Sequence, residues 1–211
     1  MSETTDQSPH KDLARLNQAK TSRPARLIAA VLTPANVVLG LLAYVSLKYS
    51  SSWLTATGWW LITLVLVVGV PYAILFRAIR AGKVADRQVV RREQRPWLFA
   101  AAITCVIVAL GVLALAGAPR QIVALILAML SGLVAMGAVT LVWKASMHLA
   151  VASGAVTVLT IENPTAGLIA AVVLPVLAWS RWRDGRHSLA QLIGGGIIGA
   201  AAAAAVYSLT R

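Results

Sequence analysis

The sequence predicts an all-α protein whose helices cross a membrane several times. Hydrophobic residues make up 59 % of the 211 residues and charged residues 12 %, whereas a soluble domain carries about 25 % charged residues. The mean hydropathy is +0.78. Several apolar runs reach the ~20 residues that a helix needs to cross a bilayer. This composition excludes a soluble globular domain.

The apolar runs give the expected elements in order. Five clear spans are predicted at residues 27–47, 53–76, 97–116, 121–143 and 189–209. Two shorter runs, 149–161 and 165–179, are separated by Glu162-Asn163-Pro164, whose proline favours a helix start. We therefore expect a polytopic membrane helix bundle of about six to seven transmembrane helices, with an active site at one membrane face.

The expected domain organisation is a polar tail followed by one membrane domain, residues 26–211. Residues 1–25 lack the apolar core of a signal peptide, so we expect a retained, disordered tail, with interfacial docking as the alternative. Cys105 is the single cysteine, which excludes an intrachain disulfide. No cluster of cysteine and histidine indicates a metal site, and we expect neither a metal nor a cofactor.

The charge distribution predicts topology and partners. The net charge is +12, but the basic residues flank apolar spans, so we expect anionic lipid and no nucleic acid as partner. With seven spans, 16 of the 19 Lys and Arg residues lie on the side of the N-terminus. The positive-inside rule then places the N-terminus and the active site in the cytoplasm. The expected location is a bacterial plasma membrane.

Two of the three histidines lie in basic clusters at the ends of apolar runs. These clusters are Lys144-Ala145-Ser146-Met147-His148 and Ser180-Arg181-Trp182-Arg183-Asp184-Gly185-Arg186-His187. Charged groups are costly beside hydrocarbon, so such clusters are functional candidates. A histidine pair among arginines suggests chemistry on a phosphate, in which one imidazole attacks phosphorus and the other protonates the leaving oxygen.

The neighbouring residues supply the other expected roles. The planar guanidinium of Arg181 matches phosphate oxygens, and the N–H groups of the helix that begins near Ser188 can face an anion. Gln191 lies four residues after His187, so its amide oxygen is the expected acceptor for the N–H of the nucleophile. Ser146 is expected to bind a phosphate oxygen beside the acid His148. Lys144 adds a positive charge one turn earlier.

A third basic cluster, residues 86–96, precedes the span at 97–116. If it is helical, one face carries Gln88, Arg91 or Arg92, and Arg95, and Pro96 opens the span. Arginines at such positions are commonly topology signals or headgroup anchors, and a lone interfacial histidine is commonly a polar cap. The combination of all three clusters on one side favours a shared phosphate site.

The ordered set Arg95-Pro96, Ser146-x-His148 and Ser180-Arg181-x5-His187 resembles the type 2 phosphatidic acid phosphatase family, lipid phosphatases related to vanadium haloperoxidases. The family pattern is K-x6-R-P, P-S-G-H and S-R-x5-H-x3-D, and the resemblance covers roughly residues 80–199. It implies six core spans with the three motifs converging at one face. It also implies that His187 is the phosphorylated nucleophile, that Arg181 and Arg95 bind phosphate, and that His148 protonates the leaving group.

Three departures from the family pattern indicate a divergent member. Gln88 stands in place of Lys, so Arg91, Arg92, Arg87 or Lys144 would supply the charge. Ala145 and Met147 replace Pro and Gly. Gln191 replaces the Asp that orients the nucleophile, unless Asp86 or Asp184 substitutes. A comparable change from Asp to Asn costs about 10⁴ in turnover in a serine protease.

The predicted function is a metal-independent hydrolysis of a lipid phosphate or diphosphate, such as phosphatidic acid or a prenyl or polyprenyl phosphate, through a phosphohistidine. The alternative is a catalytically impaired member that binds anionic lipid or scaffolds a membrane partner, which the missing Lys and Asp support. A small transporter would show internal repeats or ionisable residues in mid-span, and neither is present. Gly194-Gly195-Gly196 and Gly199, continued by residues 200–205, predict close helix packing and a possible homo-oligomer.

Overall fold

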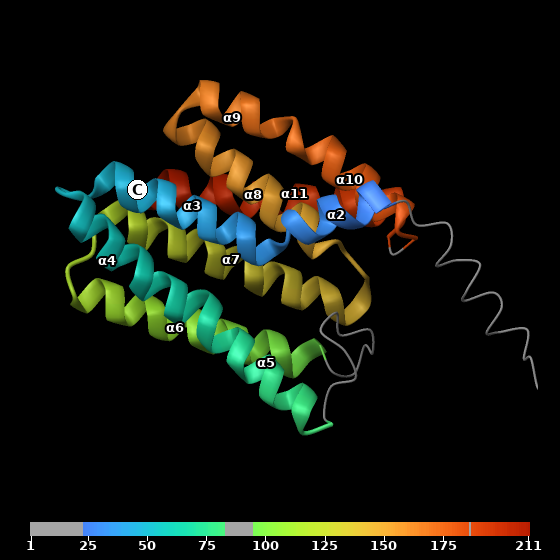
Figure 1. Ribbon diagram of the computed structural model, residues 1–211, viewed down its shortest axis with the longest axis horizontal. Helices are drawn as coiled ribbons and strands as arrows, with labels where there is room; N and C mark the ends of the chain where they lie inside the picture. The colour runs from blue at the N-terminus through green and yellow to red at the C-terminus, as the bar shows by residue number, and fades with distance from the viewer. Residues whose placement is uncertain (1–22, 83–94, 186) are drawn as a thin grey trace, which may run out of the picture.

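The computed structural model describes residues 23–82, 95–185 and 187–211, and the regular structure of these residues is entirely helical (Figure 1). The elements are α2 (Arg23–Val31), α3 (Pro34–Tyr49), α4 (Trp53–Thr63), the π-helix η1 (Leu64–Gly69), α5 (Val70–Arg80), α6 (Arg95–Leu115), α7 (Arg120–Val142), α8 (Met147–Glu162), α9 (Pro164–Ala171), α10 (Val173–Arg183) and α11 (Leu189–Thr210). The predicted all-α bundle is confirmed. Residues 1–22 and 83–94 lie outside the described part, and so does most of the predicted tail.

Five of the continuous helical stretches are long and apolar enough to cross a membrane. They are Trp53–Arg80, Pro96–Leu115, Arg120–Val142, Pro164–Arg183 and Leu189–Thr210. The pair α2 and α3, bent by 43°, would form a sixth. With its 16 residues, α8 is about 24 Å long, which is shorter than a hydrocarbon core of about 30 Å. The chain is therefore an integral membrane protein. The short apolar run predicted at residues 149–161 belongs to the short helix α8.

Prolines and side-chain caps determine where the helices break. Thr33 caps α3 by accepting from the backbone N–H of Asn36 at 3.2 Å, and Pro34 follows at the first helical position. Asn163 caps α9 in the same way, at 3.1 Å from the N–H of Ala166. Because Pro164 follows it, the predicted helix start is confirmed. Pro175 lies in the first turn of α10. Because proline has no backbone N–H, it cannot donate to the carbonyl oxygen of Ala171, and the helix is interrupted there.

The helices α8 and α11 approach each other at backbone distance. A Cβ at Gly199 would overlap the carbonyl group of Ala150, and a Cβ at Gly195 would overlap that of Ser146. Ser153 Oγ adds a hydrogen bond to the carbonyl oxygen of Gly196 at 2.7 Å. The glycine face of the last span is therefore used for packing inside the chain, as close helix packing predicted. Its use between two copies stays a prediction.

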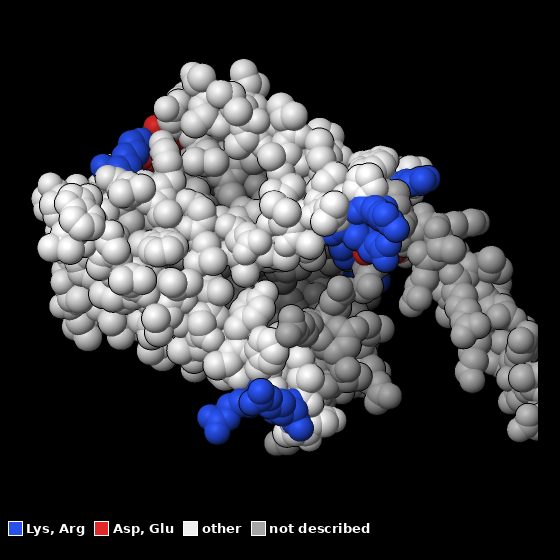
Figure 2. All heavy atoms as spheres, in the orientation of Figure 1, with Lys and Arg blue, Asp and Glu red and all other residues white. Residues whose placement is uncertain are grey.

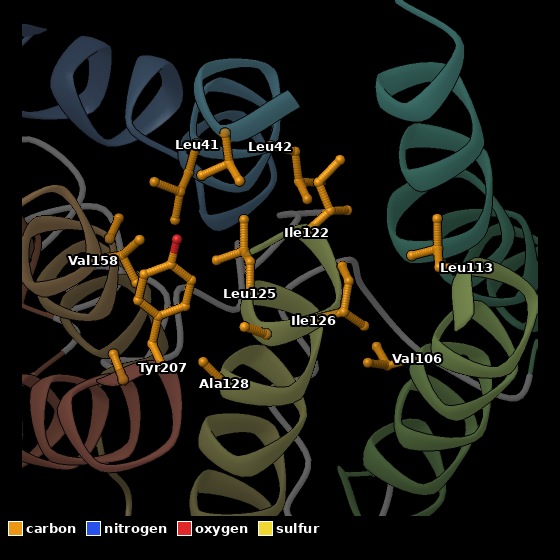
Figure 3. Close-up of a cluster of buried hydrophobic side chains, with 14 residues drawn as sticks. Leu41, Leu42, Val106, Leu113, Ile122, Leu125, Ile126, Ala128, Val158 and Tyr207 are labelled. Atoms are coloured by element: carbon orange, nitrogen blue, oxygen red, sulfur yellow. The ribbon is translucent and has the colours of Figure 1, made fainter. Parts of the chain in front are cut away.

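The main hydrophobic core lies where α3, α6, α7, α8 and α11 meet (Figure 3). Leu42, Ile122 and Leu125 are almost completely buried. The ring of Tyr207 from α11 lies between Val158 and the residues of α7 (Figure 3). This core holds α8 and α11 together, whereas Leu177 of α10 packs in a second buried cluster with Leu149 of α8 and Leu192 of α11.

On the face shown in Figure 2, the charged side chains of the described residues gather at the ends of the helices and not in the middle. At one end the carboxylate of Glu162 is fully buried and accepts hydrogen bonds from four side chains. The donors are Lys48 Nζ at 2.7 Å, Tyr207 Oη at 2.9 Å, Arg211 Nη1 at 3.4 Å, and Tyr49 Oη. This group, called the Glu162 cluster below, joins the ends of α3, α8 and α11.

Gly199→Ala tests the backbone contact between α8 and α11. The added methyl group would force the two helices apart, and overpacking costs about 1–3 kcal/mol. We expect a lower midpoint of thermal unfolding in detergent. Gly196→Ala is the matched control, because nothing lies within 4 Å of a Cβ there. Equal midpoints for the two variants would contradict the close packing.

Glu162→Gln tests the Glu162 cluster. Lys48 and Arg211 keep 35 % and 43 % of their side chains exposed, so water screens part of the lost charge interaction. We expect a loss of about 1–3 kcal/mol from the charged hydrogen bonds, measured as a lower unfolding midpoint in detergent. Arg120→Ala, which removes one exposed bond to the Thr210 carbonyl oxygen, should cost less. A midpoint for Glu162→Gln at or above that of Arg120→Ala would contradict the expectation.

Candidate functional site

Three helix ends meet at the end of the bundle opposite the Glu162 cluster. The N-terminus of α8, the C-terminus of α10 and the N-terminus of α11 lie there, and α10 packs against both other helices. They bring five of the predicted residues to one end: Ser146, His148, Arg181, His187 and Gln191. This group is called the histidine end below. The convergence of the second and third sequence clusters agrees with the expectation of a shared face.

Ser146 joins α8 to α11 at this end. Its backbone N–H donates to the carbonyl oxygen of Gln191 at 3.0 Å, and the residue is fully buried. Although Ser146 is the N-cap of α8, its side chain makes no capping bond. Among the described residues, its Oγ has no hydrogen-bond partner. A buried hydroxyl without a partner costs free energy, so Ser146 Oγ is suited to bind an oxygen of a ligand.

Arg181 is held inside the end of α10. Its residue surface is 5 % exposed, and Nη1 lies 3.2 Å from Asp184 Oδ2. The preceding Ser180 is fully buried and donates through Oγ to the carbonyl oxygen of Ala25 at 2.7 Å, which ties α10 to α2. Gly185, at φ +66°, then turns the chain toward His187. A buried guanidinium with a fixed fork is the typical arrangement for binding an oxyanion.

The two histidines are both half-buried and lie at helix starts. His148 is the second residue of α8, and His187 precedes Ser188, the N-cap of α11. The Nδ1 atom of His187 is buried. The N-terminus of a helix carries a partial positive charge and free N–H groups. With Arg181 and the exposed Lys144 beside them, these helix starts favour an anion.

Gln191 has a role that differs from the expected one. Its backbone N–H donates to Ser188 Oγ at 3.3 Å, and its side-chain Oε1 accepts from the backbone N–H of Ser188 at 3.1 Å. The two residues form a capping box at the start of α11. The amide oxygen that was expected to hold His187 therefore stabilises the helix start next to it.

The first basic cluster is described only in part. Arg87 and Arg91 lie outside the described residues, as do Asp86, Gln88 and Arg92. Arg95 begins α6, and Phe99 one turn later contacts Gly137 near the end of α7. This contact places the start of α6 at the histidine end. α6 packs against α7, and α7 packs against α11, so α7 lies between the helix that Arg95 begins and the helix that follows His187.

Comparisons with protein-family models, curated proteins and solved structures find no match for this chain. A proposal for its function therefore rests on the geometry of the histidine end and on the sequence motifs.

Two features of the structure were not predicted from the sequence. One is the Asp184 carboxylate as a partner of Arg181, and the other is the Glu162 cluster, where Glu162 was taken only as a separator of two spans.

Asp184→Asn tests whether Arg181 can bind an anion. The carboxylate occupies the guanidinium and repels an incoming anion, so its removal should tighten binding of inorganic phosphate. A gain of about 1 kcal/mol corresponds to about five-fold in Kd, measured by isothermal titration in detergent. Glu162→Gln, at the opposite end, should leave this Kd unchanged. Weaker binding by Asp184→Asn would mean that Asp184 orients Arg181 for the anion.

Proposed function

We propose that this chain is an integral-membrane phosphatase that hydrolyses a lipid phosphate or diphosphate without a metal. The observation that carries the proposal is the placement of buried Arg181 at the end of α10 and of half-buried His148, half-buried His187 and buried Ser146 at the starts of α8 and α11. Among the described residues, Ser146 Oγ has no hydrogen-bond partner. These are the groups that phosphate chemistry needs: a nucleophile, an acid and fixed positive donors. The resemblance of the three motifs to type 2 phosphatidic acid phosphatases supports the same assignment.

In the first step, an imidazole nitrogen of His187 attacks phosphorus in line with the bond to the lipid oxygen. The P–N bond forms as the P–O bond breaks, and His148 gives its proton to the departing oxygen. Arg181 and Ser146 hold the equatorial oxygens, with Arg95 in the same role if it reaches the phosphate. Fixed donors around this loose transition state supply most of the acceleration.

In the second step, water attacks the phosphohistidine. His148, now neutral, takes a proton from the water as the P–N bond breaks, and inorganic phosphate leaves. For a diphosphate substrate, the group released in the first step is the lipid monophosphate. The cycle restores both imidazoles and needs no co-reactant except water.

The engagement of Gln191 in the capping box favours one alternative. A carboxylate beside the nucleophile would stabilise the imidazolium, whereas an amide oxygen that already accepts from Ser188 is poorly suited to that task. A protein that binds lipid phosphate without turnover, or that scaffolds a membrane partner, fits this feature. The phosphatase proposal instead requires that the donors at the helix N-termini carry the stabilisation.

The proposed substrate is a lipid phosphate of the membrane leaflet that faces the histidine end. We propose that this end faces the cytoplasm of a bacterial cell; the excess of Lys and Arg on this side supports the orientation. Phosphatidic acid, prenyl diphosphates and polyprenyl phosphates all carry the phosphate that Arg181 and His187 would bind. The hydrocarbon part cannot pass through water at low cost, so the substrate approaches sideways from the bilayer.

His187→Ala tests the nucleophile. Purified protein in detergent with chelator should release phosphate from at least one of phosphatidic acid, a prenyl diphosphate and a polyprenyl diphosphate. His187→Ala should abolish release, and His148→Ala should lower it by about 10²–10⁴-fold, as expected for a general acid. Arg181→Ala should lower it strongly, whereas Arg183→Ala, an exposed neighbour on the same helix, should not.

The outcomes separate the two functions. Release that survives in folded His187→Ala would refute this nucleophile. Silence of the wild type across the panel, combined with binding of the same lipids, would replace the phosphatase by the lipid-binding alternative.

A further inference from the structure

An apolar cavity of about 340 Å³ lies inside the bundle next to the histidine end. Its floor is formed by buried residues of α7, α8 and α11, among them Leu125, Ala150, Val158 and Ala203. Its rim is formed by partly exposed residues of α3, η1 and α5, which include Val38, Val67 and Tyr72. Figure 2 shows this face of the molecule hollowed between α3 and α5. The cavity therefore opens sideways, toward lipid.

The dimensions of the cavity match one hydrocarbon chain. Its lining on α8 extends from Met147 to Val158, a rise of about 16 Å at ~1.5 Å per residue. This is about half of a ~30 Å hydrocarbon core, the depth of one leaflet. Spread over that depth, the volume corresponds to a channel about 5 Å across, and carbon atoms in contact lie about 3.5–4.0 Å apart. A space of this size suits one chain.

The cavity reaches the first turn of α8, beside the candidate site. Met147 lines it, and the residues on either side of Met147 are Ser146 and His148. Toward the opposite end, the lining stops at Leu41, Leu125 and Val158, which belong to the packed core. A lipid whose headgroup lies at the histidine end could place a chain along α8 without leaving its own leaflet.

We propose that this cavity binds the single hydrocarbon chain of a lipid phosphate, so that a single-chain substrate, such as a prenyl or long alkyl phosphate, is preferred over two-chain phosphatidic acid. The proposal rests on the proposed function for the position of the phosphate. Lipid tails are as apolar as the lining, so transfer from the bilayer contributes little free energy. Shape therefore decides the preference: the cavity holds one chain, and the second chain of a two-chain lipid would remain outside the rim without a place in the cavity.

Ala102→Phe tests the cavity by filling it. Ala102 on α6 lines the cavity, while Ala114 on the same helix is exposed outside it. The probe is a long-chain alkyl phosphate with a photoreactive diazirine near the end of its chain, added to the full chain in detergent. In the wild type, mass spectrometry should place the crosslinks on cavity residues of α3, α7 and α8. Ala102→Phe should reduce these crosslinks at least ten-fold, and Ala114→Phe should retain them.

A second readout compares substrates. The ratio of phosphate release from a long alkyl phosphate to that from butyl phosphate should fall at least ten-fold in Ala102→Phe and stay unchanged in Ala114→Phe. Wild-type release should also be faster from the single-chain substrate than from phosphatidic acid. Ala35→Phe, which fills the cavity from α3, repeats both measurements if Ala102→Phe does not fold.

The outcomes distinguish the cavity from the chemistry. Cavity crosslinks without phosphate release would support the chain site and refute the phosphatase. Phosphate release with crosslinks elsewhere, or with equal ratios in the cavity and control variants, would refute the chain site while the phosphatase stands. Faster release from phosphatidic acid would refute the single-chain preference.

Discussion

The candidate site depends on the close backbone contact between α8 and α11, which glycines of α11 make possible. Helices normally pack with their axes about 8–10 Å apart because side chains lie between them. At Gly195 and Gly199 the α8 backbone occupies the place that a Cβ would take. This proximity allows the Ser146 N–H to reach the Gln191 carbonyl oxygen, which brings the two helix starts to the same level. His148 and His187 lie at these two starts.

Much of the fold could be predicted because its causes are local. An apolar run of about 20 residues requires a membrane helix, and Pro164 and Ser188 marked helix starts that the structure contains. The glycines of α11 likewise predicted close packing. The same local reasoning could have gone further, because Ser188-x-x-Gln191 is the pattern of a capping box. Reading it as such would have assigned the Gln191 side chain to the helix start.

The candidate site could be predicted only in part, and from the rarity of polar residues, not from local helix signals. Ser146, His148, Arg181 and His187 stood out because polar groups are rare in such a chain, and parity of the spans placed them on one side. The contact of Arg181 with Asp184 spans three residues, so helical spacing could have indicated it. The cavity arises from six separate segments, and the Glu162 cluster joins residues 114 positions apart. No local pattern encodes such contacts.

The Glu162 cluster also imposes an order on biogenesis. Lys48 enters the membrane with α3, but its carboxylate partner is synthesised 114 residues later. At ~5–20 residues per second, translation separates the two by about 6 to 23 s. Through that interval the ammonium group must stay at the aqueous surface. In the folded structure, the ring centroids of Tyr44 and Tyr49 lie 5.9 and 5.3 Å from Lys48 Nζ. The inserted helices can therefore lock into their final arrangement only after α8 has emerged from the ribosome.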